Sequence, residues 1–256
     1  MSKPELVAVE PLSEAFPGGM AHREGTLVPE LLLELDGSGG IFFEHHTLLW
    51  KDPAVQIGLK KLPGGIKRKI AGLDFFLTMT SSAGRIAFSM DAPGRIIGHH
   101  LHQGDTLLVR EHQFVAATDN LDYSFERVQG VRNMLVGGSG LFVDRFSTKG
   151  SHSTVWLHAG GDLLEVALGA GEQIDVEAGS WLYRDASVKM EAVTMGLKTG
   201  LFGGGGKLTW NRFTGPGRLG IQTLFIDPSR IAGEVGQTAA AGGIGGLIGA
   251  AVKASS

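Results

Sequence analysis

Short segments in which apolar and polar residues alternate recur along the chain. In the segment ELLLEL, Leu31, Leu33 and Leu35 are spaced two residues apart, which is the period of a β-strand with one buried face. Other segments rich in Phe, Leu, Thr and Val lie between glycine-bearing turns, and the 3.6-residue period of a long helix is missing. The pattern therefore predicts an all-β protein.

One pattern occurs more than once at nearly constant spacing. The segment that starts at Gly94 matches, without a gap, the segment that starts at Gly161. Seven positions match, namely Gly94/Gly161, Leu101/Leu168, Gly104/Gly171, Asp105/Glu172, Val109/Val176, Phe114/Trp181 and Leu121/Val188. A weaker third copy lies upstream, where Leu31, Leu33 and Leu35 match Ile97, His99 and Leu101. Such periodicity, at about 66 residues, indicates a fold built from repeated units.

The second half of each unit also repeats, as a glycine, a strand-like run, a second glycine and another run. The glycine pairs are Gly72/Gly84, Gly140/Gly150 and Gly206/Gly217. Each unit is therefore expected to contain hairpins and about four strands.

The repeat predicts three tandem β units of about 66 residues that form one pseudo-threefold domain, either a sandwich or a barrel-like ring. The expected organisation is an N-terminal lead-in over 1–26, a triplicated β domain over 27–228 and a Gly/Ala-rich tail over 229–256. The units fall at about 27–90, 91–157 and 158–228. No linker separates them, which favours one domain over three.

Several longer motifs carry a family resemblance. GGIFFEHHTLLWKDPAVQI, LVGGSGLFVDRF, GDLLEVALGAGEQIDVEAGSWLYRD and FGGGGKLTWNRFTGPGRLGIQT resemble the mitochondrial-biogenesis, altered-inheritance-of-mitochondria family, over roughly Leu31 to Thr223. The resemblance implies a fold similar to the tryptophan RNA-binding attenuator protein, with three β units fused in one chain. It links eukaryotic members to the organisation of the mitochondrial inner membrane, and it implies no catalytic residues.

Charge and composition narrow the function classes. The 256 residues carry a formal net charge of −3, so no basic face for nucleic acid is expected, and no RNA-binding role is carried over from the fold's namesake. The absence of cysteine excludes disulfides and thiolate metal sites and is compatible with a cytoplasmic location. No cofactor is predicted.

The C-terminal tail is the most apolar region of the chain. The run over 239–252 is rich in glycine and too short to span a bilayer as a helix. Glycines in i, i+4 pairs, such as Gly242 and Gly246, suit close helix approach in a membrane. The tail is therefore read as disordered or docked, as a peripheral membrane attachment, or as an oligomerisation element.

Histidines are the only candidates for a chemical site. His99, His100 and His102 lie in one predicted strand, and His45, His46 and His112 lie elsewhere. Strand alternation places His99 on the core face and His100 with His102 on the opposite face, so these last two are the candidate metal ligands. Solvated surface imidazoles and an oligomer interface are the alternatives.

Two glycine-rich segments resemble catalytic motifs, but each lacks residues that the motif requires. The glycines at 203–206 before Lys207 lack the first glycine and the final hydroxyl of a phosphate-binding loop, and the glycines around Ser139 lack the second glycine of a nucleophile elbow. We therefore predict a non-enzymatic, oligomeric β scaffold that is also peripheral to a membrane. The alternative hypothesis is a cupin-like metal or small-ligand binder with enzymatic activity.

Overall fold

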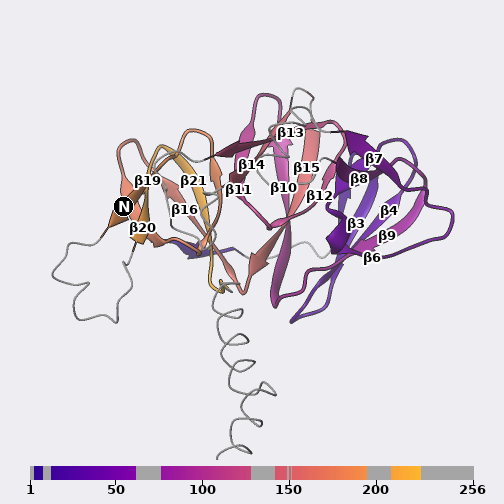
Figure 1. The fold of residues 1–256 in the computed structure, drawn as a ribbon, viewed down its shortest axis with the longest axis horizontal. Coiled ribbons are helices and arrows are strands. Elements are labelled where there is room, and N and C mark those ends of the chain that lie inside the picture. Colours follow the sequence, from indigo (N-terminus) through magenta and orange to yellow (C-terminus); the bar gives the residue numbers. More distant parts are fainter. Residues whose placement is uncertain are drawn as a thin grey trace, which may run out of the picture. The chain divides into compact units, whose positions relative to one another are not determined.

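The computed structural model describes residues 3–7, 13–61, 76–127, 142–148, 150, 152–194 and 209–225. These residues form antiparallel β-strands and one 3-10 turn at His45–Thr47, which confirms the all-β class (Figure 1). The chain divides into two compact units, Met1–Leu224 and Phe225–Ser256. The tail predicted over 229–256 lies outside the described residues.

Strands β4 to β21 follow one another in three successive stretches of six. The first stretch holds β4 (Glu30–Leu35), β5 (Ile41–Phe43), β6 (Leu48–Lys51), β7 (Gly58–Lys61), β8 (Phe76–Thr80) and β9 (Gly84–Phe88). The second holds β10 (Gly94–His102), β11 (Thr106–Arg110), β12 (Phe114–Thr118), β13 (Leu121–Arg127), β14 (Phe142–Thr148) and β15 (His152–Gly160). The third holds β16 (Leu163–Leu168), β17 (Gln173–Glu177), β18 (Trp181–Asp185), β19 (Lys189–Thr194), β20 (Thr209–Thr214) and β21 (Gly217–Gln222).

Strands pair in the same way within each stretch. The sixth strand pairs with the first and the third, and the fifth strand pairs with the second and the fourth. Each third strand also has an irregularity at the same place, between Leu48 and Trp50, Phe114 and Ala116, and Trp181 and Tyr183. Each stretch has six strands, so the expectation of about four strands per unit was too low.

Two further pairings join the stretches to one another. β5 of the first stretch pairs with β12 of the second, and β11 of the second pairs with β18 of the third. We call these pairings the first and the second joint. They are part of a six-stranded sheet and a seven-stranded sheet, beside sheets of five and three strands, and over the described residues none of the four closes on itself. Within the same residues, no strand of the third stretch pairs with one of the first.

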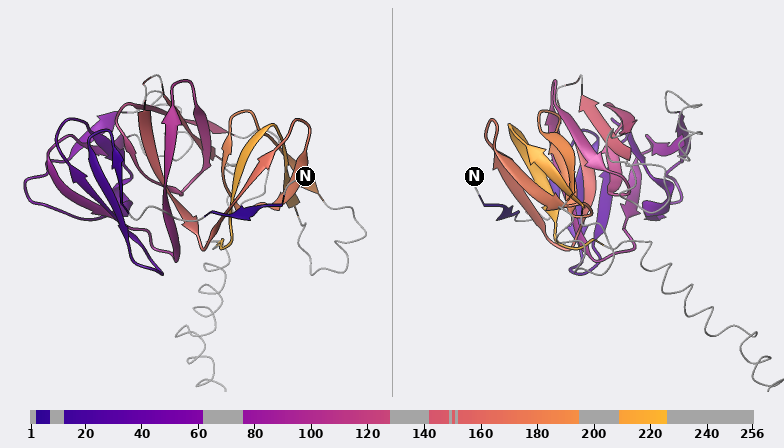
Figure 2. Two further views of the ribbon diagram at one scale, coloured as in Figure 1. Left: turned by 180° about the vertical axis from the view of Figure 1, so that it is seen from behind. Right: turned by 60° about the vertical axis from the view of Figure 1, so that its left-hand side comes forward.

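The N-terminal residues are more ordered than a loose lead-in. β1 (Glu5–Leu6) pairs with β16, and the hairpin of β2 (Ser13–Phe16) and β3 (Gly19–Glu24) adds to β4. Figure 2 shows the dark indigo N-terminal strand beside the orange strands of the third stretch. The first strands of the first and third stretches are therefore covered along one edge by N-terminal segments that sequence patterning did not identify.

The hydrophobic core is continuous across the stretches. One cluster combines Phe42 and Leu77 of the first stretch with Leu182 and Tyr183 of the third, around residues of the second. A second cluster sets Trp156 of β15 among residues of the first stretch, and a third sets Leu108 of β11 among residues of the third. Core side chains thus pack across both joints, as in a single domain.

The second glycine of the repeat is explained by packing in the first and third stretches, but not in the second. Leu35 and Leu168 lie opposite Gly84 and Gly217, which have φ of +130° and +136°, and a β-carbon on either would lie 2.8 Å from a valine methyl. In the second stretch the residue opposite Leu101, which is equivalent to Leu35, is Ser153 and not Gly150. The hairpin that ends at Ser153 is therefore longer than its counterpart in the first stretch, and the predicted equivalence of Gly150 was wrong.

Candidate functional site

The three histidines of β10 lie on alternating faces of the strand. His99 is buried at 8% exposure, which confirms its predicted core position. The side chains of His100 and His102 are 51% and 68% exposed on the opposite face. These two imidazoles therefore share a face, but they take different partners.

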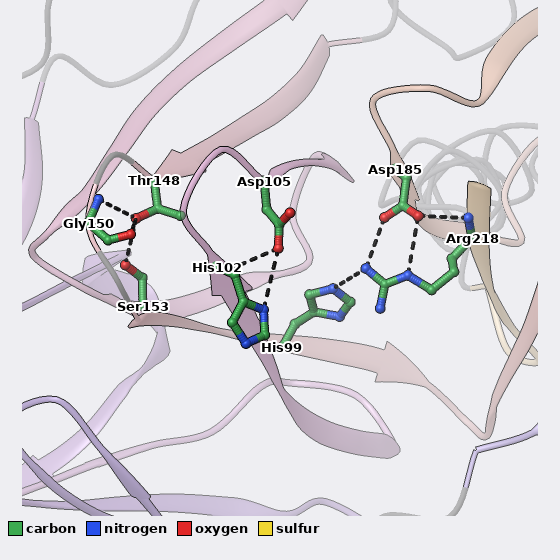
Figure 3. A network of polar contacts seen from close by, with 8 residues as sticks. All are labelled: His99, His102, Asp105, Thr148, Gly150, Ser153, Asp185 and Arg218. Carbon is green, nitrogen blue, oxygen red and sulfur yellow. Dashed lines mark hydrogen bonds and ion pairs between the residues drawn. The ribbon is translucent and has the colours of Figure 1, made fainter. Parts of the chain in front are cut away.

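His99 packs at the second joint. Its ring lies 4.9 Å from the Tyr183 ring, and Nε2 lies 3.5 Å from a terminal guanidinium nitrogen of Arg218 (Figure 3). Burial, followed by the charge of Arg218, lowers the pKa of His99 from 6.5 to about 4. The imidazole is therefore neutral at physiological pH and serves as a packing residue rather than as a cation.

The Asp185 carboxylate holds the start of β21. It accepts hydrogen bonds from the Arg218 backbone at 2.8 Å and from the Arg218 guanidinium at 3.1 and 3.2 Å. The first stretch has the same arrangement, in which Asp52 accepts from the backbone of Arg85 at 3.0 Å and from its guanidinium at 3.0 and 3.1 Å. Because the arrangement recurs at an equivalent turn, we interpret it as a structural clamp and not as one half of an active site.

A second polar contact lies beside the same joint, within the third stretch. The Tyr183 hydroxyl donates to Glu165 of β16, and Tyr183 is 2% exposed. Burial, then the negative charge of Glu165, raises the pKa of the phenol far above its ordinary value. Tyr183 is therefore a neutral donor that ties β18 to β16, and sequence patterning alone had not singled it out.

His100 belongs to a polar group beneath the N-terminal hairpin. Its ring nitrogens lie 3.1 Å from Thr154 Oγ1 and 3.4 Å from Glu14 Oε2, and Glu14 also accepts from Arg23 at 2.9 Å. Burial alone would raise the pKa of Glu14, but the His100 hydrogen bond and the Arg23 charge outweigh it and lower the pKa to about 2. The Glu14 hydrogen bond raises the pKa of His100. This group fastens β2 to β10.

His102 lies at the turn between β10 and β11. Asp105 Oδ2 accepts from the His102 backbone at 2.9 Å and lies 3.6 Å from its Nδ1 (Figure 3). The His152 ring packs against it at 5.5 Å. In the part of the chain that the structure describes, no group of three or more metal-ligating side chains converges. The metal site proposed for His100 and His102 stays a prediction.

The hydroxyls near this turn bond to one another. Thr148 Oγ1 and Ser153 Oγ lie 3.1 Å apart, and the Gly150 backbone donates to Thr148 Oγ1 at 3.1 Å (Figure 3). These are the contacts of a braced hairpin. The other glycine motifs, around Ser139 and over 203–206, lie outside the described residues. None of the helical turns described is long and apolar enough to cross a bilayer.

Comparisons with known proteins give the family and the fold. A crystal structure of a Streptococcus pyogenes protein is similar with a TM-score of 0.64 and 21% identity, over 85% of this chain and 98% of that one, which shows the fold alone. No curated protein matches the sequence. The similarity to the tryptophan RNA-binding attenuator protein stays an expectation. The family model described as mitochondrial biogenesis AIM24 matches residues 23–224, and the chain therefore belongs to that family.

Proposed function

We propose that this protein is a non-enzymatic β scaffold that works by associating with further copies of itself. The observation that carries the proposal is a set of exposed apolar side chains on, or just before, two edge strands of the first stretch, β6 and β7. Leu49, Trp50, Ile57 and Leu59 are 56%, 38%, 39% and 65% exposed. Exposed apolar side chains along sheet edges that have no partner among the described strands favour pairing with another chain.

The polar contacts of the molecule support a structural role. The Asp185–Arg218 clamp, the Tyr183–Glu165 contact and the Glu14–Arg23 pair each tie strands together. A catalytic set needs a nucleophile or base that faces a reacting group. Membership of the mitochondrial biogenesis family is consistent with a scaffold.

Light scattering on the purified full-length chain tests self-association. We expect a mass that is a multiple of 27.0 kDa and that falls on dilution. A Leu49→Ser/Leu59→Ser variant should shift towards monomer, whereas Leu6→Ser, which removes a 61% exposed leucine from β1, should not. A wild-type mass of one chain at every concentration up to about 100 μM, a range in which specific interfaces form, would overturn the proposal.

Attachment to a membrane surface through the C-terminal tail is a further part of this proposal. The apolar, glycine-rich sequence over 239–252 supports it. Vesicle sedimentation of the full chain beside a variant that lacks 236–256 is the test. Equal binding by both would remove the tail from the proposal. A cytoplasmic location stays a prediction.

A metal or small-ligand binder is the alternative prediction from the histidines. Elemental analysis of untagged protein, beside a His100→Ala/His102→Ala variant, separates it from the scaffold. Near-stoichiometric metal that is lost in the variant would favour the alternative.

A further inference from the structure

The third strands of the three stretches can be superposed residue by residue through their pairings. Trp50 lies opposite Ala87 of the sixth strand, Ala116 lies opposite Trp156, and Tyr183 lies opposite Gly220. Each of these residues directly follows the irregularity of its strand, so Trp50, Ala116 and Tyr183 occupy one equivalent position.

The second strands can be superposed in the same way. Phe43 lies opposite Thr78 of the fifth strand, Val109 lies opposite Asp144, and Val176 lies opposite Asn211. Phe43, Val109 and Val176 are separated in the sequence by the same intervals as Trp50, Ala116 and Tyr183. The second and third strands therefore keep one geometry throughout the chain.

Both joints use one register between these strands. In the first joint Phe43 lies opposite Ala116, and in the second joint Val109 lies opposite Tyr183. The remaining pairs of the first joint are Phe42 with Ala117 and Ile41 with Thr118, and those of the second are Leu108 with Arg184 and Leu107 with Asp185. A second strand of one stretch thus accepts the third strand of the next stretch.

Two strands of these types have no such partner among the described residues. β6, the third strand of the first stretch, pairs only with β9, and β17, the second strand of the third stretch, pairs only with β20. An edge strand presents unpaired backbone donors and acceptors that can pair with another chain.

Burial at equivalent positions follows the pairing. Val115 and Leu182 are 0% exposed in the joined third strands, but Leu49 at the same position of β6 is 56% exposed. Likewise Ala116 and Tyr183 are 0% and 2% exposed, whereas Trp50 is 38% exposed. The apolar surface of β6 is the surface that a partner strand covers elsewhere in the molecule.

We propose that β17 of one copy pairs antiparallel with β6 of the next copy, in the register of the two internal joints. This inference rests on the proposed self-association and gives its interface. Val176 then lies opposite Trp50, Asp175 opposite Lys51, and Ile174 opposite Asp52. The contact is head to tail, because the two strands differ, so assembly gives a ring or a filament.

Charge complementarity supports the second copy as the occupant. Asp175 and Lys51 carry opposite charges at positions that face each other in this register, where the internal joints have Phe42 with Ala117 and Leu108 with Arg184. Directly opposite residues on one sheet face interact, and opposite charges there are stabilising. Asp175 also binds Arg212, with both nitrogen to oxygen distances at 2.7 Å, so its carboxylate is held in place on β17.

Cysteine cross-linking tests the register directly, because the natural chain has no cysteine. A Trp50→Cys protein is mixed with a Val176→Cys protein and oxidised, and a dimer band on a non-reducing gel is expected from the mixture and from neither protein alone. Glu24→Cys, on β3, replaces Trp50→Cys in the control mixture, which should show only the monomer band. Dimers from Trp50→Cys alone, or no dimer from the mixture although the wild type is oligomeric, would overturn the proposed interface.

Charge reversal gives an independent readout. Lys51→Asp and Asp175→Lys each place like charges in the joint, so each variant alone should lose the oligomer by light scattering. In the mixture, β6 of Lys51→Asp can face β17 of Asp175→Lys, and β6 of Asp175→Lys can face β17 of Lys51→Asp. Every contact between the two variants then pairs opposite charges, so the mixture should regain mass. Melting temperatures near that of the wild type show that both variants fold. A mixture that stays monomeric overturns the register. A wild type that is monomeric from the start instead overturns the self-association on which this inference rests.

Discussion

The two internal joints and the two unpaired edges use equivalent strand positions, which are paired at the joints and unpaired at the edges. At the joints, Ala116 and Tyr183 are buried beneath a neighbouring strand, and Trp50 at the equivalent edge position is 38% exposed although it is the largest of the three. Residue size and hydrophobicity therefore do not determine burial here. The presence of a partner strand does, because the side chains flanking an edge are covered only when that edge is paired.

The joints also differ from each other in chemistry. The first joint pairs Phe42 with Ala117 and is apolar, whereas the second pairs Leu108 with Arg184 and is surrounded by His99, Tyr183 and Asp185. One backbone register thus tolerates both an apolar and a polar setting. The four predictions that follow separate the contribution of pairing from that of side-chain chemistry.

Phe42→Ala should have the largest effect on stability. Phe42 is 0% exposed at the first joint. The centroids of its ring and of the Phe114 ring lie 5.6 Å apart, and Lys60 Nζ lies 3.8 Å from the centroid of the Phe42 ring. Removal of such a ring leaves a cavity that costs about 3 to 5 kcal/mol of unfolding free energy. Urea unfolding measures it, with Leu59→Ala, which truncates a 65% exposed side chain, as the control. A loss below about 1 kcal/mol would mean that the first joint does not bear on stability.

Acidification should weaken the second joint through His99. Its folded pKa of about 4 lies below the ordinary value of 6.5, so the unfolded chain takes up the proton first as pH falls. The stabilisation is fully present above pH 6.5 and is lost progressively as the pH falls from 6.5 to 4, so about 2 kcal/mol of it is lost between pH 7.5 and 5.

The matched variant for this test is His99→Leu, because Leu33 occupies the equivalent position in the first stretch. Urea unfolding at pH 7.5 and 5 should show a smaller loss in the variant than in the wild type. His100→Gln on the exposed face is the control, since the pKa of His100 is raised and its effect runs in the opposite direction. Equal losses in wild type and His99→Leu would contradict the assignment.

Tyr183→Phe should cost about 1 to 2 kcal/mol, because the Glu165 carboxylate loses its hydroxyl donor at the joint. A double-mutant cycle with Glu165→Leu isolates the pair. The double variant should lose less than the sum of the two single variants, since the single change leaves a polar group unpaired. If the losses of the two single variants simply add up in the double variant, the Tyr183–Glu165 contact contributes nothing specific to holding β16 and β18 on either side of β21.

Trp50→Ser should have the smallest effect on the dilute, dissociated chain, below about 1 kcal/mol, because the side chain is partly exposed. Tyr183→Ser is the matched variant at the equivalent buried position and should cost at least about 3 kcal/mol. The difference should shrink at protein concentrations that favour assembly. Equal losses in the dissociated state would mean that β6 is already covered within one chain.

Strand identity was largely readable from the sequence, and strand number was not. Alternation at Leu31, Leu33 and Leu35 and the repeat at Val109 and Val176 predicted β4, β11 and β17 correctly. β7 was not identified, because such a short strand holds too few residues for a period-2 pattern. The N-terminal hairpin was missed for a different reason, since its exposed and buried residues depend on β4 as a neighbour.

The candidate site shows the same division. Strand parity was enough to separate the buried His99 from the exposed His100 and His102. Glu14 could not be associated with His100 from the sequence, because the two side chains that meet at 3.4 Å come from strands far apart in the chain. Tyr183 and Glu165 were likewise unremarkable until β16 and β18 were seen to flank β21.

The sequence by itself determined the all-β class, the repeat spacing and the face on which each histidine lies, because all three follow from periodicity along the chain. Only the tertiary structure decided which second strand meets which third strand, and therefore that β6 and β17 are left as edges among the described strands. Pairing between strands far apart in the chain is set by long-range packing, and the same apolar residue is core in one stretch and surface in another depending on its neighbour.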